Sequence, residues 1–579
     1  MKSSVIYRFK HQLIALMLIS YLPISSVLAN TSDKQLNRIA DIYTQELLET
    51  TQVYAYFINL PLERHDKLAD NTPQASKKFA EMESKLLSEL NTIDTKTLSS
   101  QKARIFHAKI VEALEADIEK TICKTELWNV NHMQSPANIL STLIGIQPVD
   151  SEQNKQDAIA RWRDAARYYR QEIENLKVGI EQGYSAPKRV VIRVVEQLQQ
   201  LNHIAPGNHP FMKLAKRAND KAFEQKFENL LQQQLIPAMK AYQEYLENEY
   251  LDKARTQLGI HVLPNGRACY MAQYRAHTTL KRTPEQVFEL GLKTVNDNKD
   301  KFRKLGKQFY KTDTFSDAVK MANLDEKEKF ATAQAMHDFF EEVVKRSKAV
   351  STQYFKKLPK VQMLVEAIPD YQQGLGQSAH YVPGSDDRFA KFAYDPTNYS
   401  NENYGTAEIV TVHEGYPGHH LQIALVQEQV NFHPIESAFS NTAFIEGWAR
   451  YAETLSEEAG IYQSDSAKIL RRSWPARGMV VDTGLHILGW TNQQAIDFIK
   501  ESGNPALSND ADAMLDRIAT LPGQLTAYDS GALEIMALRK QYKNAMGDDY
   551  DIKEFHRLIL ENGDAPLLVL KQQVLRTIK

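Results

Sequence analysis

Four residues close together in the sequence can bind a metal ion or transfer a proton: His413, Glu414, His419 and His420. Zinc hydrolases often place two histidines four residues apart on one helix, with a glutamate directly after the first. Here the next histidines follow His413 after six and seven residues. Seven residues return a straight helix to nearly the same face but about 10 Å along its axis, and one zinc ion with bonds of about 2 Å cannot span that distance. A straight helix on which His413 and His420 bind the same ion is therefore excluded.

Two residues between these histidines allow the chain to leave the helical path. Pro417 has no backbone donor and Gly418 has wide backbone freedom, so the helix can bulge or kink there. Such a bulge would bring His419 to the place that a histidine four residues after His413 normally occupies. We therefore expect His413 and His419 to be metal ligands, with His420 the less favoured ligand or a residue behind the site.

The sequence His-Glu-Gly-Tyr-Pro-Gly-His-His at 413–420 resembles the His-Glu-x-x-Pro-Gly-His-His pattern of the bacterial domain-of-unknown-function 885 family. Further matching stretches are Phe444-Ile445-Glu446-Gly447-Trp448-Ala449, Val481-Asp482-Thr483-Gly484-Leu485-His486, and Pro522-Gly523-Gln524 with Tyr528 and Gly531. That family is distantly similar to glutamate-zincin metallopeptidases, which include the thimet-oligopeptidase, Taq-carboxypeptidase and angiotensin-converting-enzyme groups. The resemblance covers most of the mature chain and implies a metallopeptidase-like fold.

A third protein ligand is expected because a catalytic zinc site has three protein ligands and one open position. Glu446 lies 27 residues after His419, on a strongly helical stretch at 443–459. This spacing resembles that of the glutamate zincins and implies that Glu446 is the third ligand. The alternative is an ordinary ion pair between Glu446 and Arg450, four residues further along the same helix.

A helix expected near residues 477–486 carries three more polar candidates. The resemblance implies that His486 stabilises an oxyanion, although a lone histidine is more often a structural hydrogen-bonding residue. Asp482, four residues earlier, is a candidate to orient a ligand histidine. Arg477 is a candidate substrate contact.

Tyr528 and Gln524 follow Pro522 and Gly523, which predict a loop that enters a helix. A phenol near a metal ion can stabilise an oxyanion. A buried tyrosine with a bonded hydroxyl is an equally good interpretation of Tyr528. Gln524 is a weaker candidate for contact with the substrate.

These residues predict a hydrolase with one zinc ion. The ion would lower the pKa of a water molecule, and Glu414 would act as general base and return the proton to the leaving amine. The expected substrate is a peptide. Two other functions stay open: a metal-dependent hydrolase of non-peptide amides or esters, and a catalytically inactive peptide-binding homologue.

Helical spacing of apolar residues dominates the elements that must position this site. It covers residues 33–133, 155–182, 187–203 and 208–256, the last with a break expected near Pro237. A helix start is predicted at Thr283-Pro284-Glu285-Gln286, where threonine can cap and proline fits the first position. The last helical segment is expected at 551–579.

Two stretches before the metal motif have the composition of β-strands, at 361–366 and 389–394. They could form an edge that holds an extended substrate by main-chain hydrogen bonds, or an ordinary hairpin. We expect a mainly α-helical, two-lobed fold with a deep cleft and a small sheet near the site. The turn at 259–267 is expected to divide an N-terminal lobe, 30–260, from a catalytic lobe, 261–579, with both lobes in one continuous domain.

The first 29 residues have the features of a secretory signal peptide. Basic residues precede a mostly apolar run at 13–22, and Val27-Leu28-Ala29 fits cleavage after Ala29. The alternative, an uncleaved membrane anchor, is disfavoured by the shortness of the run. A lipoprotein is not expected, because no cysteine follows the cleavage site. The expected location is periplasmic or secreted.

Composition sets further limits on the function. A net charge of −2 gives no signal for nucleic-acid binding or for stable membrane association after signal cleavage. A hydrophobic content of 43% suits a globular protein. Cys123 and Cys269 are the two cysteines of the chain, and in an oxidising compartment they can pair or remain as two buried thiols. The oligomeric state is left open.

Overall fold

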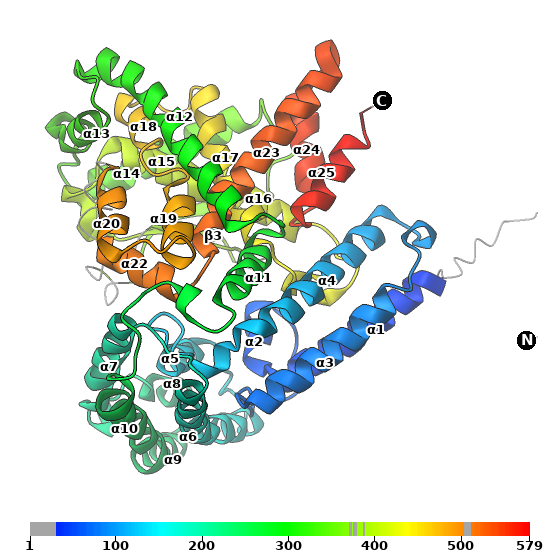
Figure 1. The fold of residues 1–579 in the computed structure, drawn as a ribbon, viewed down its shortest axis with the longest axis vertical. Coiled ribbons are helices and arrows are strands. Elements are labelled where there is room, and N and C mark those ends of the chain that lie inside the picture. The colour runs from blue at the N-terminus through cyan, green and yellow to red at the C-terminus, as the bar shows by residue number, and fades with distance from the viewer. Residues whose placement is uncertain (1–30, 370–372, 374–378, 386–387, 503–510, 579) are drawn as a thin grey trace, which may run out of the picture.

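Amphipathic helices dominate the structure, as the spacing of apolar residues predicts (Figure 1). The computed structural model describes residues 31–369, 373, 379–385, 388–502 and 511–578. The mainly helical fold and the small sheet that were expected are both present.

The first four helices include three long ones, α1, α3 and α4, which lie side by side (Figure 1). Their buried face includes Leu36 and Phe106, and Ile435 and Phe439 from the C-terminal half of the chain complete this core. The four helices are α1 (Thr31–Thr50), α2 (Gln52–Phe57), α3 (Pro73–Leu90) and α4 (Gln101–Lys120).

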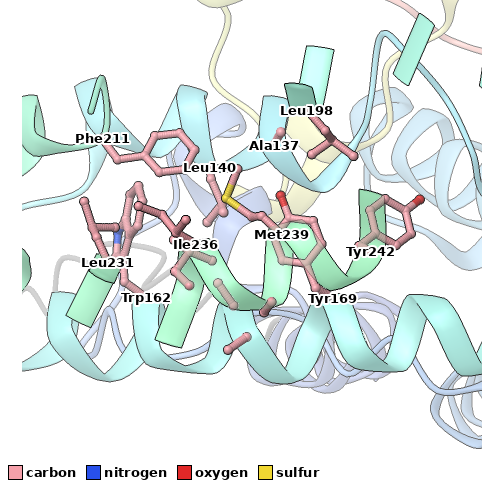
Figure 2. Packing of buried hydrophobic residues seen from close by; sticks show 14 of the residues in the cluster. Ala137, Leu140, Trp162, Tyr169, Leu198, Phe211, Leu231, Ile236, Met239 and Tyr242 are labelled. Carbon is pink, nitrogen blue, oxygen red and sulfur yellow. The ribbon is translucent and has the colours of Figure 1, made fainter. Parts of the chain in front are cut away.

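A second hydrophobic core lies among α5–α10 (Figure 2). Trp162 on α6 meets Phe211 edge-on at 5.1 Å between ring centroids. The α-helical pattern is interrupted directly before Pro237, as expected, but the interruption is a π-helical segment, Leu231–Leu235, and the chain stays helical from α9 through this segment into α10. The helices are α5 (Pro136–Ile146), α6 (Glu152–Glu181), α7 (Lys188–Asn202), α8 (Met212–Arg217), α9 (Lys221–Leu230) and α10 (Ile236–Tyr245).

The remaining helices belong to the part of the chain that carries the metal motif, and α14, α17, α18 and α24 pack directly against α15 or α16 of that motif. The predicted helix start at Thr283 is confirmed: the Thr283 hydroxyl accepts the backbone N–H of Gln286, and the side-chain oxygen of Gln286 accepts the backbone N–H of Thr283. The helices are α11 (Gly266–Thr278), α12 (Pro284–Tyr310), α13 (Phe315–Leu324), α14 (Ala333–Ser351), α15 (Tyr404–Glu414), α16 (His419–Gln427), α17 (Thr442–Glu458), α18 (Asp465–Leu470), α19 (Arg477–His486), α20 (Asn492–Lys500), α22 (Ala511–Thr520), α23 (Gln524–Met546), α24 (Ile552–Glu561) and α25 (Leu567–Leu575).

The small sheet has three strands in the order β1-β3-β2. Strands β1 (Met363–Ala367) and β3 (Ala390–Tyr394) confirm the two predicted strands within two residues. They are parallel to each other, so they do not form a hairpin. The outer partner of β3 is the short antiparallel strand β2 (His380–Val382), which the sequence did not predict.

Helices α17 and α23 cross closely where two glycines meet. A Cβ on Gly447 would lie 2.6 Å from the Cα of Gly531, and a Cβ on Gly531 would lie 1.7 Å from the carbonyl oxygen of Ala443. Neither position can hold a larger residue without a shift of the backbone. This contact fixes the helix that carries Glu446 against the helix that carries Tyr528.

A disulfide joins Cys123, after α4, to Cys269 on α11, with 4.8 Å between the Cα atoms. It decides between the two states that the sequence left open, and it ties the N-terminal helices to those around the metal motif. Among the described residues, no helix combines the length and the apolar character needed to span a membrane.

Candidate metal centre

The chain loops out of the helix between His413 and His419. Helix α15 ends at Glu414, and α16 begins at His419. The backbone N–H of Gly418 donates to the carbonyl of Val412, six residues earlier, at 3.0 Å. An α-helix makes this bond to the fourth residue back, so two extra residues are accommodated. His419 therefore takes the place of a histidine four residues after His413, as expected from the sequence.

Two neighbours hold this loop in shape. A Cβ on Gly418 would lie 2.0 Å from the carbonyl oxygen of His413, so only glycine fits there. The indole N–H of Trp448 on α17 donates to the carbonyl of Pro417 at 2.9 Å, and Trp448 is fully buried. The helix that supplies Glu446 thus also anchors the loop between the two histidines.

His413, His419 and Glu446 converge, and ligand atoms from all three lie within 4.8 Å of one another. Nε2 of His413 lies 3.7 Å, and Nε2 of His419 3.5 Å, from Oε2 of Glu446. Two ligand atoms on one tetrahedral ion, each bonded at about 2 Å, are roughly 3.3 Å apart. The second ring nitrogen of His419, Nδ1, is buried without a hydrogen-bond partner. Donor types and spacing therefore fit one zinc ion.

The electrostatics of the three residues also favour a cation. Burial opposes a charge on His413, but hydrogen bonds to Glu446 and Glu453 outweigh it and raise the pKa of His413 to about 10. Burial alone would raise the pKa of Glu446, yet hydrogen bonds from the two histidines hold it well below its usual range. The carboxylates of Glu446 and Glu453 thus favour a positive charge at His413, which a metal ion could supply in place of the proton.

Glu453 completes the environment of His413, and the sequence interpretation missed it. Its Oε1 lies 2.8 Å from Nδ1 of His413. Arg450 pairs with this same carboxylate at 2.9 Å, so the alternative in which Arg450 pairs with Glu446 is not what the structure shows. Glu453 follows Glu446 by seven residues, two turns of the helix. That spacing, together with the need of a ligand histidine for a carboxylate partner, was the available signal.

Glu414 lies beside the sheet. Its Oε2 accepts the backbone N–H of Tyr381, in the edge strand β2, at 3.0 Å. Tyr381 lies opposite Phe392 of β3, and the bond of its N–H to Glu414 shows that this N–H points away from the sheet. The strand next to Glu414 is therefore β2, whereas β3 lies in the centre of the sheet and has no free edge.

His420 does not join the three ligands. Its ring lies 3.0 Å from the hydroxyl of Tyr416 and 3.2 Å from the hydroxyl of Tyr381. Burial and the nearby Lys348 lower the pKa of His420 to about 4. His420 is therefore a neutral residue between the loop and β2, and the structure brings His419 rather than His420 next to His413 and Glu446.

The three candidates on α19, His486, Asp482 and Arg477, bond to other residues of the protein and do not face the three candidate metal ligands. Nδ1 of His486 accepts the backbone N–H of Ile260 at 3.2 Å, and Nε2 donates to the carbonyl of Ile518 at 2.9 Å. Both nitrogens are occupied, and burial lowers the pKa of His486 to about 3. The oxyanion role is thus wrong, and the structural alternative describes this histidine.

Asp482 and Arg477 are corrected in the same way. Asp482 accepts the hydroxyl of Tyr270 at 2.6 Å and the backbone N–H of Gly523 at 3.0 Å, so it orients no histidine. Burial raises the pKa of Asp482 to about 7 despite these bonds. Arg477 is fully buried and donates to the carbonyls of Ser473 and Phe498. It cannot contact a substrate.

Tyr528 and Gln524 lie near the centre, at the start of α23. Burial and the charge of Glu446 raise the pKa of Tyr528. The Tyr528 hydroxyl accepts from Arg517 at 3.2 Å, and the side-chain oxygen of Gln524 accepts from the same arginine at 2.8 Å. The sequence interpretation did not include Arg517.

Comparisons with known proteins identify the family and the fold. No curated protein matches this chain. A Colwellia psychrerythraea structure described as a "putative lipoprotein" has a TM-score of 0.85 at 22% identity, over 95% of this chain and 99% of that one. A Shewanella oneidensis structure, described as a "putative lipoprotein of unknown function", has a TM-score of 0.77 at 18% identity, over 93% and 99%. A family model matches residues 53–574, so the chain belongs to DUF885, described as bacterial proteins of unknown function.

Proposed function

We propose that this protein is an extracytoplasmic zinc-dependent metallopeptidase. The observation that carries the proposal is the convergence of His413, His419 and Glu446, with Glu414 directly after the first histidine. Zinc bound by these three residues would supply a Lewis acid and lower the pKa of a water molecule to about 7. Proton transfer and stabilisation of the oxyanion would come from side chains around the zinc site.

Glu414 is the proposed general base. The N–H of Tyr381 holds its Oε2, which leaves Oε1 to take a proton from the attacking water and pass it to the leaving amine. Tyr528 is the proposed oxyanion donor, because its hydroxyl remains protonated at neutral pH and lies near Glu446. Arg517 and Arg450, whose guanidinium groups both lie 5.9 Å from the centroid of the Tyr528 ring, would strengthen that donor.

The proposed binding mode of the peptide uses β2. The outward N–H of Tyr381 is taken by Glu414, but the carbonyl of Tyr381 lies on the same edge and can accept an N–H from an extended peptide. The two lobes and the deep cleft expected from the sequence belong to this proposal. The lipoprotein descriptions of the structural relatives, the disulfide and the signal peptide expected at residues 1–29 support a periplasmic or secreted location.

The test is metal analysis of the purified protein, followed by turnover of peptides, small amides and esters with and without a chelator. Bound zinc, with peptide cleavage that the chelator stops and zinc restores, supports the proposal. Cleavage of only the small amides or esters would assign the site to a different hydrolase. Metal-independent peptide binding without turnover would make the protein an inactive homologue.

A further inference from the structure

We propose that Arg517 binds a carboxylate group of the substrate beside the metal centre. The protein would then prefer peptides with a free carboxyl terminus or an acidic side chain near the scissile bond. This inference rests on the proposed peptidase function, but the binding of peptides to Arg517 can be measured without turnover.

Arg517, on α22, reaches the centre through Tyr528. Its guanidinium lies 5.9 Å from the centroid of the Tyr528 ring, and Nη2 donates to the Tyr528 hydroxyl. Arg450, one helical turn after Glu446, lies 5.9 Å from the centroid of the same ring. Arg517 is therefore one side chain away from the residues around the metal ligands.

The two arginines at this tyrosine differ in their partners. Arg450 pairs with Glu453 and lies close to the buried Asp529, so its charge is compensated. Arg517 donates only to neutral groups, Gln524 and Tyr528. Throughout the part of the chain that the structure describes, no carboxylate forms an ion pair with Arg517.

The adjacent carboxylate in the sequence cannot neutralise Arg517. Asp516 is fully buried and pairs with Arg189 and Arg193 on α7. Nε of Arg517 is buried without a hydrogen-bond partner, although the residue as a whole is only half-buried. A guanidinium with unused donors in a partly desolvated site matches the planar, two-oxygen geometry of a carboxylate.

Arg477, the arginine that the sequence suggested as a substrate contact, differs from Arg517 in its exposure to solvent. Arg477 lies over the rings of Phe315 and Phe498 and has no exposed surface. Arg517 is held in place by Gln524, which was itself expected to touch the substrate. We assign to Gln524 the task of orienting Arg517, and to Arg517 the contact with the substrate.

The experiment measures peptide binding to the zinc-loaded Glu414→Gln protein, which should not cleave what it binds. Two peptide pairs of equal length are titrated by calorimetry. One pair differs in a free or amidated carboxyl terminus, and the other in an internal Glu or Gln. Each pair is measured with Arg517 intact, with Arg517→Gln and Arg517→Lys, and with Arg163→Gln as a control on an exposed arginine of α6.

With Arg517 intact, the charged member of one pair should bind about 10-fold to 100-fold more tightly than the neutral member. The pair that shows the preference identifies the source of the carboxylate. Arg517→Gln should reduce the ratio to about 1, whereas Arg517→Lys, which keeps the charge without the two-pronged guanidinium geometry, should give an intermediate ratio. Arg163→Gln should change neither. Equal zinc content and equal unfolding midpoints establish that the variants are folded.

The proposal is overturned if Arg517→Gln keeps the preference, if neither pair shows one, or if none of the peptides binds. Failure of the peptidase function has a different outcome. In that case the carboxylate preference depends on Arg517, but the zinc-loaded protein with Glu414 intact cleaves none of the four peptides.

Discussion

Nδ1 of His413 donates to Oε1 of Glu453 across 2.8 Å, which leaves Nε2 as the nitrogen that faces Glu446. Glu453 is almost completely buried and also receives the guanidinium of Arg450. A ligand histidine with its other nitrogen bonded to a carboxylate has a fixed ring orientation and a fixed tautomer. Glu453 would thus orient His413 for the proposed metal ion without itself being a ligand.

Glu453→Ala should weaken zinc binding by about 10-fold to 100-fold, because the ring of His413 loses its orienting partner. Competition with a chromogenic chelator measures the affinity. Glu458→Ala is the matched control, since Glu458 lies on the same helix but is exposed. Equal zinc affinities of Glu453→Ala and the unchanged protein would show that Glu453 does not orient His413.

Glu414→Gln should keep zinc bound but reduce peptide hydrolysis by about 10² to 10⁴ in rate, because glutamine cannot accept the proton of the attacking water. The amide oxygen can still accept the N–H of Tyr381, so the local structure should be preserved. Metal analysis and turnover are measured on the same preparation. Glu446→Ala is the comparison, and it should lose zinc itself because a ligand is removed. The opposite pattern, with zinc lost from Glu414→Gln and kept by Glu446→Ala, would contradict both roles.

The convergence of His413 and His419 could be predicted because its determinants are local in sequence, whereas the place of Glu446 beside them was implied by the family resemblance. Pro417 and Gly418 predict that the chain loops out of the helix. The length of this loop determines that His419, and not His420, faces His413. Helix α17 and the strand composition before the motif are also local properties, so their boundaries were found within a few residues.

The partners of the other candidates could not be predicted, because they come from distant parts of the chain. His486 bonds to the backbone at Ile260 and Ile518, and Asp482 to Tyr270. Nothing in the helical spacing of α19 distinguishes a helix buried on all sides from one that lines a site. Strand β2 was missed for a related reason: three residues are too few to show an alternating pattern.

Gly418→Ala should abolish zinc binding and destabilise the protein by about 1 to 3 kcal/mol. The added Cβ would meet the carbonyl oxygens of His413 and Val412 at 2.0 and 2.4 Å, so the loop must move away from His413. Thermal unfolding and zinc titration measure the two effects. Gly145→Ala, whose Cβ would have no neighbour within 4 Å, should leave zinc binding unchanged. Full zinc affinity in Gly418→Ala would show that the loop tolerates a side chain.

Removal of the disulfide between Cys123 and Cys269 should lower the free energy of unfolding by about 2 to 5 kcal/mol, because the bond closes a long loop in the unfolded chain. Urea unfolding with and without reductant measures the change. A variant with both cysteines replaced by alanine should have the stability of the reduced protein and should not respond to the reductant. A stability that is the same in both redox states would contradict the prediction.

Glu83 on α3 should make the protein less stable as the pH rises. It is almost completely buried and its Oε1 has no partner. Burial, and then the charge of Asp117, raise the pKa of Glu83 to about 8. The folded protein therefore binds a proton that the unfolded chain releases near pH 4.5. The stability that proton binding at Glu83 contributes is fully present below pH 4.5 and is lost as the pH rises through about 8.

Between these limits the free energy of unfolding should fall by up to about 1.4 kcal/mol per pH unit from this one group. Glu83→Gln removes the titration, so its stability relative to the unchanged protein should increase from pH 5 to pH 8. Urea unfolding at each pH measures the difference, with Glu81→Gln as the control because Glu81 is exposed on the same helix. Parallel pH profiles for Glu83→Gln and the unchanged protein would show that Glu83 has an ordinary pKa in the folded state.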